Sequence, residues 1–212
     1  MGADKLNTNI LTIDCSYGIN ICVFAKDKDF VFSCLETKKQ SDSLLLEIDN
    51  LLIKAGLTIK DIDVIAVCVG PGSFTGIRVA ISIAKGLALG SHAKIVTFNS
   101  FETIVPEEKN FGILVEGFGD NTYYYLNKFG RVFMGCENKD KIVKLFENTK
   151  VYTLSKKNMQ MFEELGPKLV QYNVKQAIVS RVEHSKFITS NQIAPLYLRA
   201  SQAEIERNNH GN

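Results

Sequence analysis

Residues 64–90 read VIAVCVGPGSFTGIRVAISIAKGLALG and predict a strand, a glycine-rich turn and a helix in direct succession. Residues 64–69 are apolar and mostly β-branched without alternation, which is typical of a central strand covered on both faces. In the turn, Gly70 and Gly72 permit positive φ angles, and Pro71 fixes one dihedral angle between them. The strand, turn and helix together indicate an α/β fold.

The helix predicted over residues 76–90 is unusual because it is built from small residues. Gly76, Ala80, Ala84 and Ala88 recur at a spacing of four, and Arg78 and Lys85 are its charged residues. A surface helix normally has one apolar stripe and one charged face. Each interior glycine costs about 1 kcal/mol relative to alanine, so we expect close approach of another backbone to compensate. That backbone belongs either to the chain's own sheet or to another protein.

Length and composition limit the function classes. The 212 residues suit one large domain or two small lobes, and the 45% hydrophobic fraction is ample for a core. A net charge of +2 is too small to indicate nucleic-acid or membrane binding by itself. Five cysteines, an odd number without a Cys-x-x-Cys pair, indicate a reduced, cytoplasmic compartment. The sequence shows no apolar run near the roughly 20 residues that cross a bilayer, so we expect no membrane association.

The order of elements is predicted to repeat. In the first half, strands at 10–16, 19–25 and 30–36 precede a helix at 41–55, the strand at 64–69, the helix at 76–90 and a strand at 94–98. The second half shows strands at 111–115, 122–127, 131–136 and 150–154, with helices at 139–148, 155–165 and 173–184. We therefore expect two lobes, over residues 9–104 and 105–200, of mixed sheets with helices on their faces. Residues 1–8 and 204–212 are expected to be flexible.

The turn at residues 70–76 is a candidate phosphate site. N–H groups at a helix start attract anions, and Asp14 at the end of the first strand could hold a hydrated Mg²⁺ ion beside a nucleotide. The alternatives are a purely structural turn and an Asp14 that caps the turn after its own strand. The spacing matches neither a Walker A loop nor a dinucleotide fingerprint. The candidate phosphate-binding residues are Asp14, Ser16, Gly70, Gly72, Ser73 and Thr75.

Other chemistry receives little support from the sequence. The three histidines share no metal-ligand spacing, and no serine stands in a Gly-x-Ser-x-Gly elbow. Residues 123–125 are three consecutive tyrosines, which suggests either base stacking or packing within a hairpin. Because neighbouring residues on a strand face opposite sides, at most two of the three rings share a surface, which favours packing.

The sequence resembles the TsaB (YeaZ) family. The resemblance is densest over residues 10–104: ILTIDCS at 10–16, VGPGSFTGIR at 69–78, AKGLA at 84–88 and SFE at 100–102 follow the family pattern, as does PLYLR at 195–199 near the end. The sequence departs from the family at residues 116–120, where EGFGD replaces an Asp-Ala-Arg start of the second lobe. It also has Gln40-Ser41 where a histidine often begins the helix.

The resemblance implies an actin-like, two-lobed fold of the ASKHA, ribonuclease H-like type with a reduced second lobe. It also implies a non-catalytic subunit in the threonylcarbamoylation of tRNA adenosine next to the anticodon. The implied partners are a TsaD-like catalytic subunit, of which this family is a paralogue, and a TsaE-like ATPase. The resemblance further implies that the chain forms a homodimer when the partner is missing and that it reaches tRNA only through the complex. No cofactor is expected to bind tightly, and ATP or ADP would bind only weakly or within the complex.

We predict that the partner packs on the first lobe's two helices. The residues predicted to form this interface are Leu45, Ile48, Leu52, Gly76, Ile77, Ala80, Ile81, Ala84, Leu87 and Ala88. The alternative functions are an ATP-using enzyme of the same fold, such as a small kinase that uses Asp14 and the turn, and, with less support, a peptidase. Direct tRNA binding by this chain alone is a further alternative, which its small net charge disfavours.

Overall fold

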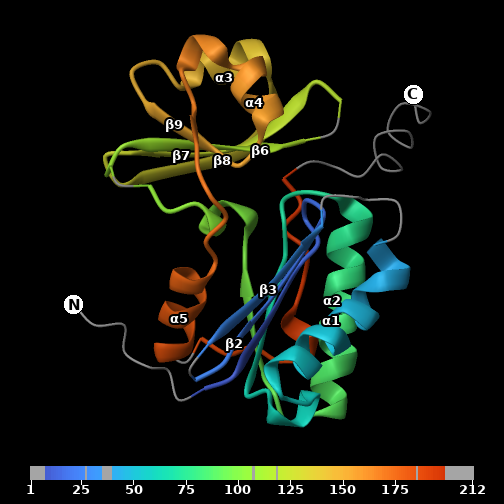
Figure 1. Ribbon diagram of the computed structural model, residues 1–212. Coiled ribbons are helices and arrows are strands. Elements are labelled where there is room, and N and C mark those ends of the chain that lie inside the picture. The colour runs from blue at the N-terminus through green and yellow to red at the C-terminus, as the bar shows by residue number, and fades with distance from the viewer. Residues whose placement is uncertain are drawn as a thin grey trace, which may run out of the picture. The chain divides into compact units, whose positions relative to one another are not determined.

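The computed structural model describes residues 8–26, 28–34, 40–106, 108–117, 119–184 and 186–198, and for residues 40–42 it describes the backbone alone. The chain forms two compact units (Figure 1). The first comprises residues up to Glu102 together with Val174–Pro195, and the second comprises Thr103–Asn173 with the residues from Leu196 onward.

The first unit is built on a five-stranded sheet in the order β3-β2-β1-β4-β5. Its elements are β1 (Ile10–Asp14), β2 (Ile19–Phe24), β3 (Asp29–Cys34), α1 (Gln40–Ala55), β4 (Val64–Cys68), α2 (Phe74–Gly90), β5 (Lys94–Phe98) and α5 (Lys175–Glu183), with short 3₁₀ turns at Ile59–Asp61, Ser100–Thr103 and Ser190–Gln192. Strands β1, β2 and β3 pair antiparallel, whereas β1, β4 and β5 pair parallel. Helices α1 and α2 lie on one side of this sheet, and α5 lies on the other (Figure 1).

Strand β4 is the covered central strand that its sequence predicts. All five of its residues are buried, and it lies between β1 and β5. Non-alternating apolar residues suit this position because helices cover the sheet on both sides. The main core of the unit joins the inner residues of the sheet to the buried faces of α1 and α2.

The second unit repeats the plan of the first. Its elements are β6 (Phe111–Glu116), β7 (Asn121–Lys128), β8 (Arg131–Asn138), α3 (Lys139–Leu145), β9 (Lys150–Thr153), α4 (Lys156–Met161) and β10 (Lys168–Leu169), with a 3₁₀ turn at Glu163–Leu165. The sheet order is β10-β9-β6-β7-β8, which read backwards matches the first sheet strand for strand. Helices α3 and α4 cover one face of this sheet (Figure 1). The predicted repeat of three strands, a helix and a strand is therefore confirmed.

The division into units differs from the predicted boundary after residue 104. The first crossing falls at Glu102–Thr103, close to the prediction, but residues 174–195 return to the first unit. They do so because their apolar side chains complete its packing: Ile178 and Ile193 are buried, and the Ile188 N–H donates to the Ile95 carbonyl on β5 at 2.9 Å. Assigning residues 105–200 wholly to the second lobe was therefore wrong.

The predicted helix boundaries hold better in the first half than in the second. The helix predicted over residues 155–165 is only α4, followed by a separate 3₁₀ turn that ends at Gly166 in the left-handed conformation. The two-residue strand β10 was not predicted. Residues 1–7 and 204–212, predicted to be flexible, lie outside the described residues, as do residues 35–36 of the third predicted strand and Arg199 of the family's closing signature.

Candidate functional site

The glycine-rich turn packs against the turn that follows β1. The Ser73 N–H donates to the Ser16 carbonyl at 2.8 Å. Gly72 has a φ of 155°, and a Cβ atom there would overlap the Ser16 carbonyl oxygen. Glycine is therefore required at this position by close approach of the chain's own backbone. Ser73 caps α2, because its hydroxyl accepts the Gly76 N–H at 3.2 Å.

Asp14 stabilises the turn that follows β1. Its side chain is only 2% exposed, and Oδ1 accepts the Ser16 N–H at 2.8 Å. The structure thus brings together Asp14, Ser16 and the turn at residues 70–73, while Thr75 lies exposed on the first turn of α2. These contacts support the structural interpretations of Asp14 and Ser73. Phosphate binding by this group of residues stays a prediction.

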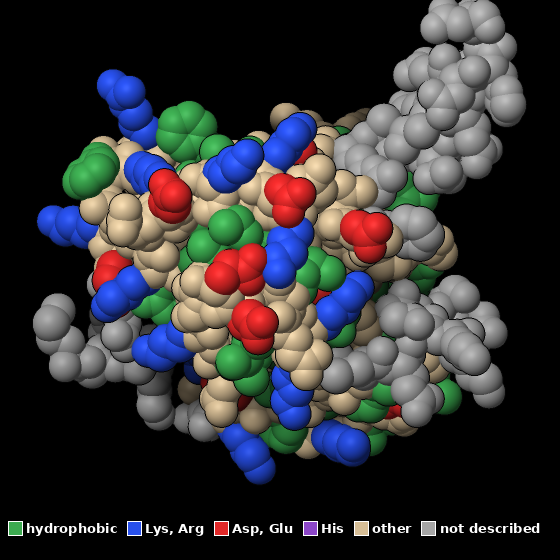
Figure 2. Space-filling view, turned by 90° about the horizontal axis from the view of Figure 1, so that it is seen from above, with side chains coloured by type: hydrophobic (Ala, Val, Ile, Leu, Met, Phe, Trp, Pro, Cys, Tyr) green, Lys and Arg blue, Asp and Glu red, His purple; other side chains and the backbone are tan. Residues whose placement is uncertain are grey.

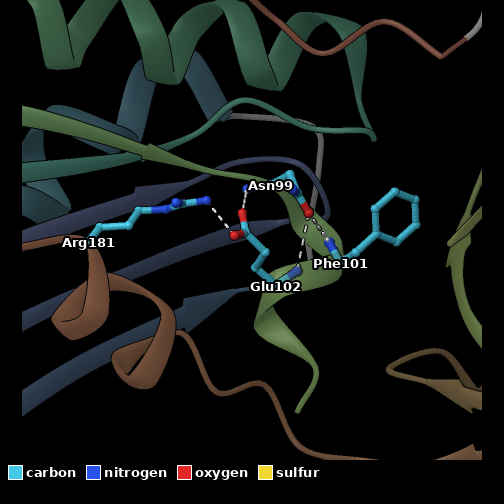
Figure 3. Close-up of polar contacts among 4 residues, drawn as sticks. All are labelled: Asn99, Phe101, Glu102 and Arg181. Atoms are coloured by element: carbon cyan, nitrogen blue, oxygen red, sulfur yellow. Dashed lines mark hydrogen bonds and ion pairs between the residues drawn. The ribbon is translucent and has the colours of Figure 1, made fainter. Parts of the chain in front are cut away.

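The 3₁₀ turn after β5 supports the glycine-rich turn from its other side. The Ser100 hydroxyl donates to the Pro71 carbonyl at 2.6 Å, and the Ser100 N–H donates to the Gly70 carbonyl at 2.9 Å. Figure 3 shows how this segment is fixed: Asn99 Oδ1 accepts the N–H groups of Phe101 and Glu102, and the Glu102 carboxylate accepts the Asn99 N–H at 2.7 Å.

An ion pair joins this segment to α5. Arg181 Nη2 donates to Glu102 Oε1, and both side chains are mostly buried (Figure 3). The returning helix therefore fixes the segment that carries Ser100. The glycine-rich turn therefore bonds to Ser16 after β1 and to Ser100 after β5, and α5 acts on it only indirectly, through the Arg181–Glu102 ion pair.

The buried cysteines near Asp14 are core residues. Burial, with a smaller contribution from the Asp14 charge, raises the pKa of the Cys15 thiol to about 12. Burial likewise raises the pKa of Cys68, which also lies close to the Ser100 hydroxyl. These thiols stay protonated at neutral pH, as expected of cysteines that act as small apolar side chains.

The small-residue face of α2 is covered by the chain's own sheet. Its buried residues are Gly76, Ile77, Ala80, Ile81 and Ala84, and the helix packs on β4, β1 and β5 and touches α1. Ile48 and Leu52 of α1 are buried in the same core, and Leu87 and Ala88 are partly buried against it. The prediction that a partner packs on the buried residues Gly76, Ile77, Ala80, Ile81 and Ala84 is therefore wrong, whereas an interface at the partly exposed Leu87 and Ala88 stays a prediction. Small side chains are found there because they let the helix lie close to its own sheet.

The opposite side of these helices carries several exposed apolar residues. Leu45, Leu46 and Ile53 on α1 are more than half exposed, and Leu89 on α2 is 80% exposed. Ser82 and Gly86 are also exposed on α2. We call these six residues the helical outer face. Of the ten predicted interface residues, Leu45 belongs to it.

At Gly86 neither the packing nor the backbone conformation of the described residues requires a glycine. A Cβ atom there would have no heavy atom within 4 Å among the described residues, and its φ lies outside the left-handed region. A helix-interior glycine that its own structure does not require costs about 1 kcal/mol relative to alanine. Gly86, Leu46 and Ile53 are not among the ten residues predicted for the interface, because that prediction followed the helical spacing of small and apolar residues, which marks the buried side.

Several other features of the described residues bear on chemistry. No group of three His, Cys, Asp or Glu side chains among them is placed to hold a metal ion.

Tyr124 packs edge-on against Phe146 in the core, while Tyr125 stacks on Phe111 on the other face of the sheet. The three tyrosines thus take the alternating positions expected of a strand. No helix in the described part of the chain is both long and apolar enough to cross a membrane.

Comparison with known proteins identifies the family. The family model described as "TsaD: tRNA N6-adenosine threonylcarbamoyltransferase" matches residues 31–165. The chain belongs to the TsaD family. The TsaB resemblance is confirmed by two relatives, both described as "tRNA threonylcarbamoyladenosine biosynthesis protein TsaB". The Escherichia coli protein is 34% identical over 67 residues, 32% of this chain and 29% of the relative. The Haemophilus influenzae protein is 30% identical over 95 residues, 44% of this chain and 40% of the relative.

The chain therefore matches less than half of the length of these two relatives. The predicted actin-like fold is confirmed through a solved structure from Pseudomonas aeruginosa, described as an uncharacterized protein with similarity to peptidase YEAZ. It superposes with a TM-score of 0.73 at 16% identity, covering 91% of this chain and all of the other. At this identity the likeness concerns the fold alone.

Proposed function

We propose that the chain is a non-catalytic subunit that pairs with a TsaD-like catalytic chain in the threonylcarbamoylation of tRNA adenosine. Membership of the TsaD family and the likeness to TsaB support the pathway. The observation that supports a pairing role is the helical outer face, which combines exposed leucine and isoleucine side chains with a glycine whose Cβ position meets no described atom within 4 Å. Apolar residues of this kind, gathered on neighbouring helices, are typical of protein–protein interfaces.

The contacts of the glycine-rich turn support a non-catalytic role. The polar groups that an ATP-using enzyme would direct at a nucleotide are engaged within the chain: Asp14 accepts the Ser16 N–H, and Ser73 caps α2 and donates to Ser16. Participation of a TsaE-like ATPase, contact with tRNA only through the complex, and self-pairing through the helical outer face when the partner is absent are parts of the same proposal.

Co-purification tests the pairing surface. A TsaD-like chain from the same source would be co-expressed with tagged wild type, with Ile53→Glu or Leu89→Glu, and with the control Leu169→Glu. Leu169 is an exposed apolar residue of β10 in the second unit, so it matches the test residues in chemistry but not in place. We expect both helical variants to lose the partner at least tenfold relative to wild type, because a buried carboxylate without a counter-charge is costly.

The variants must fold for this result to count. Each substituted side chain is exposed, so we expect thermal unfolding of all four isolated proteins to agree within a few degrees. Equal recovery of the TsaD-like chain by wild type and both helical variants would contradict the proposed surface. Failure of wild type itself to recover any TsaD-like chain would contradict the proposed function.

A further inference from the structure

Strand β8 forms a long, regular edge of the second sheet. It pairs with β7 on one side, in a register that runs without interruption from Asn121↔Asn138 to Lys128↔Arg131. Natural edge strands usually carry a proline, a bulge or a lysine that discourages pairing with another chain. The eight residues of β8, RVFMGCEN, contain neither proline nor lysine, and the unbroken register excludes a bulge.

The same edge exposes large apolar side chains. Val132, Phe133 and Met134 are each about half exposed, and Phe129 in the hairpin turn before β8 is 88% exposed. Phe129 has a φ of 52° and Gly130 a φ of 81°, which is the geometry of a two-residue turn that favours asparagine and glycine. An aromatic residue is strained there, and its exposed ring contributes little to the core. Figure 2 shows a different surface over α3 and α4, where acidic and basic side chains alternate.

The sequence of β8 is complementary to itself. When two identical strands pair antiparallel, the residue numbers of every opposing pair add up to the same value. This value must be even, because only alternate residues of an edge strand direct their N–H and C=O groups outward, and these residues must oppose one another. A sum of 268 places Arg131 of one copy opposite Glu137 of the other, and symmetry repeats this ion pair at the other end. The neighbouring even registers, 266 and 270, place Arg131 opposite Gly135 and Glu137 opposite Phe133, so neither matches the charges.

The remaining pairs of this register also fit. Phe133 stands opposite Gly135, over which the Tyr124 ring of the same chain lies, so Phe133 would face that aromatic ring. Phe133 and Gly135 share the sheet face of Tyr124 and Leu126. On the other face, Met134 stands opposite Met134, and Val132 opposite Cys136. Apolar residues thus oppose apolar or small ones throughout, which is the arrangement that stabilises antiparallel strand pairs.

We propose that β8 is a self-association edge, at which a second copy of this chain pairs antiparallel with Arg131 opposite Glu137. The second-unit sheets of the two copies then join into one continuous sheet. This contact is separate from the helical outer face and goes beyond the proposed function. Because one strand edge buries less than a standard interface, the dimer is transient, and we expect a dissociation constant on the order of micromolar.

Charge reversal tests the register. Arg131→Glu gives a chain with glutamate at both positions, and Glu137→Arg gives one with arginine at both. In the proposed dimer each variant opposes like charges twice, so we expect its self-association to weaken about tenfold or more in sedimentation equilibrium. An equimolar mixture of the two variants restores both opposite-charge pairs. We therefore expect the mixture to associate about as tightly as wild type.

A crosslink provides a readout that pairing through the helical outer face cannot mimic. Met134 opposes itself, so Met134→Cys is expected to form a disulfide-linked dimer on mild oxidation, whereas Phe133→Cys, which opposes glycine, forms much less. Circular dichroism of each variant checks that the fold is kept, because Glu137→Arg also removes the ion pair to Lys141 at 3.0 Å. A mixture no tighter than its separate components, or equal crosslinking of the two cysteine variants, overturns the proposal. So does a wild-type chain that stays monomeric at hundreds of micromolar.

Discussion

Gly72, Gly86 and Gly112 differ in the space around them, and this space decides whether the fold requires a glycine at each position. A Cβ atom at Gly72 would overlap the Ser16 backbone, and one at Gly112 would overlap the Phe146 ring, so both positions are filled by neighbours within the chain. At Gly86 a Cβ atom would meet nothing within 4 Å among the described residues. The same residue type thus permits close packing at two sites and leaves open space at the third.

Alanine substitutions at two of these positions are expected to change stability in opposite directions. Gly112→Ala should destabilise the chain by about 1–3 kcal/mol, because the added methyl group displaces Phe146 in a packed core. Gly86→Ala should stabilise the isolated chain by up to about 1 kcal/mol, because alanine favours the helix and meets no neighbour. Urea unfolding followed by circular dichroism measures both. A stabilising Gly112→Ala or a clearly destabilising Gly86→Ala would show that the packing described here is wrong.

Helix α2 shows how one element combines two requirements. Its inner side is made of small and β-branched residues that lie against β1, β4 and β5, and its outer side carries Ser82, Gly86 and Leu89. Even Lys85, one of its two charged residues, is partly buried, and its ammonium group donates to the Ile193 carbonyl at 3.4 Å. On the outer side the exposed Arg78 lies over the Phe74 ring, and the residues that follow at helical spacing, Ser82, Gly86 and Leu89, are uncharged. Most of α2 therefore looks apolar or small in the sequence.

Arginine substitutions on the two sides of α2 separate folding from pairing. Ala84→Arg places a charge where the side chain is fully buried, so we expect it to destabilise the first unit by several kcal/mol. Ser82→Arg adds the same charge two residues away on the exposed side, and its stability should stay within about 0.5 kcal/mol of wild type. Thermal unfolding distinguishes the two. In the co-purification assay, the stable Ser82→Arg variant should lose the TsaD-like chain, and normal binding by that variant would contradict pairing through this side.

At the scale of the whole molecule, the two units share one plan, and each includes a second segment from later in the chain. After the second unit, α5 and residues up to Pro195 rejoin the first unit, where Ile178 and Ile193 are buried. The outgoing and returning chain lie side by side, because the Asn173 N–H donates to the Thr103 carbonyl at 2.9 Å. The first unit is therefore discontinuous in sequence.

This discontinuity predicts how fragments behave. A fragment of residues 8–104 lacks Ile178 and Ile193, whose burial contributes about 3–6 kcal/mol together, and we expect it to show no cooperative unfolding. Residues 8–103 joined to residues 173–198 through a short Gly-Ser linker restore both side chains, and this fragment should unfold cooperatively. Thermal circular dichroism and amide dispersion in NMR spectra compare them. Cooperative unfolding of the shorter fragment at the same temperature would contradict the assignment.

Elements with a strong local pattern could be predicted from the sequence alone. The buried strand β4, the turn at Gly70 and Gly72, the long helices α1 and α2 and the repeated order of strands all follow from hydrophobic periodicity and from glycine conformations, which act between near neighbours. The shorter helices of the second unit were placed less well, because six or seven residues give a weak periodic signal and tertiary packing sets their ends.

The sequence by itself determined the kinds of elements, their order and the family pattern around the glycine-rich turn, because these depend on residues that are close along the chain. Only the tertiary structure decided which side of α2 is buried, that Asp14 and Ser73 are engaged by Ser16, that α5 returns to the first unit, and that β8 is left at an edge. Those outcomes depend on contacts between residues far apart in sequence. A helix with apolar or small residues on both sides contains no local information about which side the sheet will cover.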